Sequence, residues 1–150
     1  MAGRLHVSGM VHININVSDV KRSSAFYGPI LRYFDYECVE ARHEGDWPFE
    51  DWRPRSFRKG HMISLSPADV TQPFAREARR AVGRFNHFAF AAADAADVDR
   101  FHAEVLVPLA QAGLAEIEDP PVACPEYGAG YYATFFFDPD GIKYEVVFTP

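Results

Sequence analysis

Cysteine, positive charge and long apolar runs are all scarce in this sequence. Its 150 residues include 2 cysteines, Cys38 and Cys124, and neither sits at a metal-ligand spacing, so we expect free thiols and no disulfide framework. The 15 Lys and Arg against 21 Asp and Glu give a net charge of −6, which argues against nucleic-acid and anionic-membrane partners. No run approaches the roughly 18 apolar residues of a membrane span, and Met1–His6 lacks the apolar core of a signal peptide. We therefore expect a soluble, cytoplasmic protein.

Apolar material is plentiful by contrast. Hydrophobic residues make up 48% of the chain and aromatic residues 15%, which is enough for one domain or for two half-domains that share a core.

The two halves of the chain repeat one pattern of elements. Three positions recur at an offset of 75 residues, each seven residues from the next: His12, Asp19 and Phe26, then His87, Asp94 and Phe101. In each half an alternating strand is followed by a helix cap and an amphipathic helix, with Ser18 or Asp19 as the first cap and Asp94 as the second. We therefore predict an α+β fold of two tandem βαβββ modules, with residues 1–67 and 84–150 as the modules and residues 68–83 as a linker.

The expected elements follow the same order in both halves. In the first half we predict a strand at Met10–Val17, a helix at Val20–Leu31, a strand at Tyr33–Ala41, a loop at His43–Arg55, and short strands near Ser56–Arg58 and His61–Ser66. In the second half we predict a strand at His87–Ala91, a helix from Asp94, a loop or lid at Pro120–Gly130, and strands at Tyr131–Phe137 and Ile142–Phe148.

Glu145 interrupts the apolar last strand. Side chains alternate along a strand, so Glu145 points away from the face that carries Tyr144 and Val146. If the Asp-Pro-Asp-Gly turn is a four-residue loop, Thr134 lies opposite Glu145 and Tyr132 lies opposite Val147 on the same surface. A carboxylate among apolar neighbours needs solvent, a counter-charge such as a lysine, or a metal ion.

Two histidines are predicted to share that surface. His12 lies opposite the Val and Ile face of its strand, and His87 lies opposite Phe88 and Phe90, so both should project from the side without helices. A lone histidine on a strand is usually structural. Two at matching repeat positions, together with Glu145, favour a divalent metal site.

The chain resembles the vicinal oxygen chelate superfamily, which includes glyoxalase I, extradiol dioxygenases, and fosfomycin- and bleomycin-resistance proteins. The resemblance rests on the stretches around His12, around His87 and from Phe137 to Glu145, and it covers nearly the whole chain. It implies that the modules form a curled mixed sheet cup with helices on the outer face. It further implies one divalent metal ion (Fe, Zn, Ni or Mn) held by His12, His87 and Glu145, with Glu145 also acting in catalysis. Modules in this superfamily exchange between chains in some members, which is compatible with a homodimer.

The sequence departs from glyoxalase I at one ligand position. The repeat alignment places Ser64 where Glu145 stands in the second half, and a hydroxyl is a poor ligand for most divalent ions. We therefore expect three protein ligands.

Three functions remain open on this reading. The first is lyase or isomerase chemistry on an oxygenated small metabolite that chelates the metal. The second is iron(II)-dependent ring cleavage, and the third is drug binding without catalysis, which has no need of a ligand set. The expected partner is a small-molecule substrate, contacted by four side chains: Asn14, Trp47, Tyr132 and Thr134.

Overall fold

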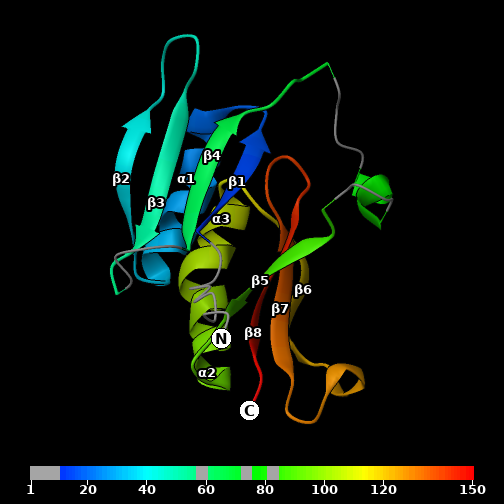
Figure 1. Cartoon of the computed structure of the whole chain (residues 1–150). Helices are drawn as coiled ribbons and strands as arrows, with labels where there is room; N and C mark the ends of the chain where they lie inside the picture. Colours follow the sequence, from blue (N-terminus) through cyan, green and yellow to red (C-terminus); the bar gives the residue numbers. More distant parts are fainter. Residues whose placement is uncertain (1–10, 57–60, 72–75, 81–84) are drawn as a thin grey trace, which may run out of the picture.

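The computed structural model describes residues 11–56, 61–71, 76–80 and 85–150. Within these ranges, eight strands build two separate four-stranded sheets (Figure 1). The first sheet contains β1 (His12–Val17), β2 (Tyr36–Arg42), β3 (Phe49–Pro54) and β4 (Met62–Pro67). The second contains β5 (His87–Ala91), β6 (Glu116–Ala123), β7 (Tyr132–Phe137) and β8 (Lys143–Phe148).

The helices follow the first strand of each sheet. They are α1 (Val20–Tyr33), α2 (Ala95–Phe101) and α3 (Val107–Gln111), with the π-helical turn η2 (His102–Leu106) joining the last two. Two short 3-10 helices, η1 (Arg76–Arg80) and η3 (Pro125–Tyr127), lie in connections. Asp19, one of the two residues predicted to cap the first helix, caps α1, and Asp94 caps α2 as predicted. Each accepts a hydrogen bond from a backbone N–H in the first turn. In the described part of the chain no helix combines the length and the apolar content needed to cross a membrane.

Both sheets have the same topology. The order is β1-β4-β3-β2 in the first and β5-β8-β7-β6 in the second, and in each the first strand runs parallel to the last and the other pairs are antiparallel. Asn14 lies beside Ser64 in the first sheet as Ala89 lies beside Glu145 in the second. The predicted duplication is confirmed, and Ser64 does occupy the position equivalent to Glu145.

Two strands were missed by the sequence analysis. β3 lies inside the stretch predicted as the loop His43–Arg55. It was missed because its buried face carries Glu50 as well as Trp52, so the alternation of apolar residues that indicates a strand is broken. β6 overlaps the predicted loop Pro120–Gly130, and its two prolines fall at an irregularity in the pairing with β7. Proline is tolerated there because β6 is the edge strand of its sheet. The strand predicted at Ser56–Arg58 lies mostly outside the described residues.

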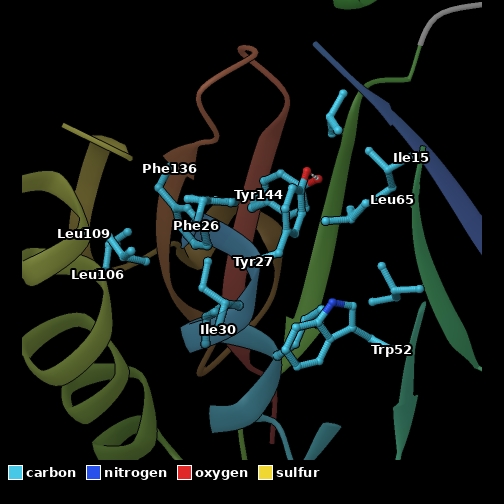
Figure 2. Close-up of a cluster of buried hydrophobic side chains, with 14 of the residues drawn as sticks. Ile15, Phe26, Tyr27, Ile30, Trp52, Leu65, Leu106, Leu109, Phe136 and Tyr144 are labelled. Carbon is cyan, nitrogen blue, oxygen red and sulfur yellow. Dashed lines mark hydrogen bonds between the residues drawn. The ribbon is translucent and has the colours of Figure 1, made fainter. Parts of the chain in front are cut away.

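One hydrophobic core serves both halves, with α1 at its centre (Figure 2). α1 contacts the strands of its own sheet, yet the ring of Phe26 also lies 6.2 Å from that of Phe136 and 5.9 Å from that of Tyr144, both in the second sheet. Further along, the ring of Phe34 stacks on that of Phe90 at 4.9 Å. Because helices fill this side of both sheets, the opposite faces are the ones left for binding.

Polar contacts also join α1 to the β7–β8 turn. The Tyr27 hydroxyl donates to a carboxylate oxygen of Asp138 at 2.6 Å and lies 2.6 Å from the Tyr144 hydroxyl. At the helix N-terminus Arg22 forms an ion pair with Asp140 at 2.7 Å. The two halves are therefore fixed to one another through α1.

Candidate functional site

His87 and Glu145 meet on the face of the second sheet that α1 and α2 do not cover. The parallel pairing of β5 with β8 sets Ala89 beside Glu145, and His87 is two residues earlier on the same face of its strand. Nε2 of His87 lies 4.0 Å from Oε1 of Glu145. The side chain of His87 is exposed, whereas Glu145 is only 6% exposed. The parity argument from the sequence is confirmed for this pair.

Tyr131 supports the buried carboxylate. Its hydroxyl lies 3.0 Å from Oε1 of Glu145 and donates to it. Burial, reinforced by this hydrogen bond to Glu145, raises the pKa of Tyr131 to about 12, so the phenol keeps its proton at ordinary pH. Lys143, on the same strand face as Glu145, pairs instead with Glu118. Among the described residues, no lysine or arginine forms an ion pair with Glu145.

His87 and Glu145 line a cavity of about 390 Å³. Besides His87 and Glu145, its walls include three cationic side chains and three aromatic ones: Arg79, Arg80, Lys143, Tyr127, Tyr131 and Phe135. This volume suits a small molecule, and the mixture of rings and charges suits one that has both apolar and charged parts.

The structure places His12 on the other sheet. His12 is exposed on β1, and its neighbour Ile13 belongs to the face that packs toward the shared core. Within the described ranges, no three His, Cys, Asp or Glu side chains lie close enough together to hold a metal ion. Among the residues that the structure describes, the two sheets share no strand pairing and His12 does not meet His87 and Glu145 within one chain. The sequence had left open whether the three side chains meet within one chain or between two.

Asn14 and Trp47 also belong to the first half. Asn14 is exposed, two residues after His12 on the same face of β1. Trp47 is 57% exposed in the β2–β3 connection, where its carbonyl oxygen accepts hydrogen bonds from the Arg42 guanidinium. Neither lines the cavity that holds His87 and Glu145.

The predicted register of the last hairpin is wrong by one residue. Phe137 pairs with Lys143, so Phe135, and not Thr134, lies opposite Glu145. Thr134 is fully buried, and the Tyr132 hydroxyl donates to Asp99 of α2 at 2.8 Å. Tyr132 and Thr134 therefore lie on the helix-covered face, because one residue of slip moves every side chain of a strand to the other face.

The sequence analysis missed several residues of the cavity. Tyr131 and Phe135 have the correct parity once the register is shifted, so the alternation of β7 contained that signal. Arg79 and Arg80 come from the segment treated as a linker, and no periodicity indicated that they would face the site.

A smaller apolar cavity of about 150 Å³ lies between the two halves on the helix-covered side. Its lining includes Ile13 and Ile15 of β1, Tyr27 of α1, and Phe88 and Phe90 of β5. It contains neither His87 nor Glu145, so it is separate from the candidate site.

This duplicated fold, with a histidine and a glutamate on its open face, defines the class of protein. The model of the Glyoxalase/Bleomycin resistance protein/Dioxygenase superfamily matches residues 9–146. The chain belongs to that superfamily. No curated protein sequence matches it significantly.

Solved structures agree with this membership. A candidate glyoxalase from Bacillus halodurans is 26% identical with a TM-score of 0.66, over 95% of this chain and 96% of that one. A glyoxylase/bleomycin resistance protein/dioxygenase domain from Frankia sp. EAN1pec is 23% identical with a TM-score of 0.67, over 96% and 99% of the two chains. The fosfomycin resistance protein FosX from Listeria monocytogenes, as an E126Q mutant with Mn(II) and 1S,2S-dihydroxypropylphosphonic acid, is 20% identical with a TM-score of 0.65, over 96% and 94%. The last two likenesses concern the fold.

Proposed function

We propose that this protein is a metal-dependent enzyme of the lyase or isomerase type that acts on a small oxygenated metabolite. His87 and Glu145 are two of the proposed metal ligands, and His12 is the third. The observation that carries the proposal is the approach of His87 to Glu145, at 4.0 Å, inside a cavity on the face of the second sheet opposite α1 and α2.

The two donor atoms suit a divalent ion. An imidazole nitrogen and a carboxylate oxygen are accepted by iron, zinc, nickel and manganese. Two donors that bind one ion at about 2.0–2.2 Å, with about 90° to 110° between them, lie roughly 2.8 to 3.6 Å apart. The 4.0 Å between His87 and Glu145 is slightly longer, so the two side chains would move closer together when an ion binds. When bound, such an ion would polarise a substrate oxygen as a Lewis acid. FosX, which has this fold, is described with Mn(II) and a ligand whose hydroxyls are adjacent, so we propose a substrate with neighbouring oxygen atoms.

We further propose that His12 comes from a second copy of the chain. In one chain α1 packs against both sheets and His12 stays exposed on the first, away from the cavity on the second. A homodimer in which the first half of one copy covers the cavity of the other would bring His12, Asn14 and Trp47 there together. Asn14 and Trp47 would then contact the substrate.

The remaining roles belong to side chains of the cavity itself. Tyr131 holds the Glu145 carboxylate in place through its hydrogen bond, and the buried carboxylate is the group that would take a proton from the substrate. The rings of Tyr127, Tyr131 and Phe135 would shield the reacting part of the substrate from water.

An iron(II)-dependent ring-cleaving dioxygenase is the second candidate. The observation that favours it is the group of three aromatic rings beside His87 and Glu145, which would accept an aromatic substrate. Oxygen consumption that requires ferrous ion would select this candidate over the first.

Metal analysis of the purified, untagged protein tests the ligand set. We expect one equivalent of divalent metal per chain, lost in His12→Ala, His87→Ala and Glu145→Gln. His102→Ala, in the η2 turn, and the exposed Glu126→Gln are the matched controls and should retain the metal. A full equivalent in any of the first three variants would remove that residue from the proposed site.

Co-expression tests the exchange between chains. A mixed dimer of His12→Ala with His87→Ala contains one complete site if His12 acts in the neighbouring copy, and none if it acts within its own chain. We therefore expect one metal ion per mixed dimer. A mixed dimer without metal, or a protein that sediments as a monomer, would disprove a metal site shared between two copies.

A further inference from the structure

Two arginines line the cavity of His87 and Glu145 in a chain of net charge −6. Arg79 and Arg80 both come from η1, the short 3-10 helix between the two sheets. A pair of cations at a candidate site in an otherwise acidic protein concentrates positive potential at one point.

The position of η1 on the second sheet is fixed by Arg76. Its guanidinium donates two hydrogen bonds to the Glu116 carboxylate of β6, at 2.8 and 2.7 Å, and lies 3.9 Å above the ring of Phe137. A 3-10 helix has three residues per turn, so Arg79 follows Arg76 on the same side of the helix. Nη1 of Arg79 also donates to the Arg76 carbonyl at 3.4 Å. Arg76 therefore serves as the anchor, and Arg79 extends toward the site.

The third cation of the cavity, Lys143, is already paired with a carboxylate. Lys143 forms an ion pair with Glu118 and lies over the ring of Phe135, 4.8 Å from its centre. Arg79 and Arg80 form no ion pair with any carboxylate whose side chain the structure describes. Nε of Arg79 is buried and has no hydrogen-bond partner among these residues. A buried N–H of this kind is costly unless an acceptor reaches it.

We propose that Arg79 and Arg80 bind the oxyanion group, a carboxylate or a phosphonate, of the substrate whose other oxygens lie at His87 and Glu145. The placement of the other substrate oxygens at His87 and Glu145 rests on the proposed function. The guanidinium group suits the task because its planar fork of N–H donors matches two oxygens of a carboxylate or phosphonate. The substrate class is therefore a small organic anion, which excludes neutral catechols and neutral hydroxyketones as the preferred ligands.

Titration calorimetry on the metal-free protein at low salt tests the anion site directly. The probes are inorganic phosphate, methylphosphonate and acetate. We expect binding that weakens on the order of tenfold in Arg79→Gln and in Arg80→Gln, since each removes a charge-assisted hydrogen bond. The exposed Arg55→Gln, on the first half, is the matched control and should bind as the wild type does. High salt should weaken all binding that depends on these charges.

The affinities of the variants for the three anions show whether the arginines bind an anion and which kind of anion they prefer. Arg79→Lys should recover part of the affinity because it restores the charge without the fork. Tighter binding of methylphosphonate than of acetate would assign a phosphonate or phosphate group, and the reverse order would assign a carboxylate. Equal affinities in the wild type, Arg79→Gln, Arg80→Gln and Arg55→Gln, or no binding of any probe, would overturn the inference.

The metal ligands separate this inference from the proposed function. His87→Ala and Glu145→Gln should retain phosphate binding in the metal-free state, even though both are expected to lose the metal. If these variants retain the metal and anion binding depends on the arginines, the proposed metal ligands are wrong and the anion site stands. If these variants lose the metal and anion binding does not depend on the arginines, the anion site is wrong and the proposed metal ligands stand.

Discussion

Asp138 makes the stability of this protein depend on pH in an uncommon direction. The carboxyl is 4% exposed in the β7–β8 turn. Its oxygens accept the Tyr27 hydroxyl at 2.6 Å and the backbone N–H groups of Asp140 and Ile142 at 2.9 and 2.8 Å. Burial nevertheless dominates and raises the pKa of Asp138 from its ordinary 3.8 to about 6.

The direction of the effect follows from proton binding. Between pH 3.8 and about 6 the folded state holds a proton on Asp138 that the unfolded state has released. The stabilising contribution of this proton is therefore complete below pH 3.8 and is lost as the pH rises through about 6. The rise of the pKa from 3.8 to about 6 corresponds to about 3 kcal/mol of unfolding free energy.

Asp138→Asn removes this dependence while keeping the local hydrogen bonds. The amide oxygen can still accept from Asp140 and Ile142, and the amide nitrogen can donate to the Tyr27 hydroxyl, as a protonated carboxyl would. We expect the variant to match the wild type within about 1 kcal/mol at pH 4 and to exceed it by up to about 3 kcal/mol at pH 7.

Urea unfolding of the metal-free protein, followed by circular dichroism from pH 4 to 7.5, measures the difference. The exposed Asp46→Asn in the β2–β3 connection is the control and should follow the wild-type curve. A difference between Asp138→Asn and the wild type that stays constant over this range, or that favours the wild type more as pH rises, would refute the reasoning.

Two further predictions concern the core and the site. Phe26 is fully buried against Phe136 and Tyr144, so Phe26→Ala should lower the unfolding free energy by about 3–5 kcal/mol in urea titrations, and a loss under 1 kcal/mol would contradict the shared core. Tyr131→Phe removes the hydroxyl that donates to Glu145, so the affinity for the metal should fall about 10- to 100-fold in chelator competition while the unfolding free energy changes little; unchanged affinity would contradict the supporting role of Tyr131.

The duplication could be predicted because each half encodes its own pattern locally. The spacing from His12 to Asp19 recurs from His87 to Asp94, and both acidic residues cap helices in the structure. The alternation of β5 and β8 was enough to place His87 and Glu145 on one face, since the direction of a side chain on a strand depends only on its position along that strand.

Other features depend on contacts that sequence patterns do not encode. β3 was missed because Glu50 is buried. The burial of this carboxylate is tolerated because Trp52 Nε1 donates to it at 2.8 Å and the Ser24 hydroxyl and the His43 ring also contact it. The register of the last hairpin depended on the geometry of the turn after Phe137, and one residue of error exchanged the two faces of β7.

By itself the sequence determined the two repeated units, the helix caps and the face on which each candidate ligand lies, because these follow from spacing and alternation within single elements. Only the tertiary structure decided that α1 packs against both sheets, that His12 stays apart from His87 and Glu145, and that Arg79 and Arg80 line the cavity. The physical reason is that these facts depend on how separate elements bury their apolar faces against one another, and the periodicity of a single segment does not specify its partner.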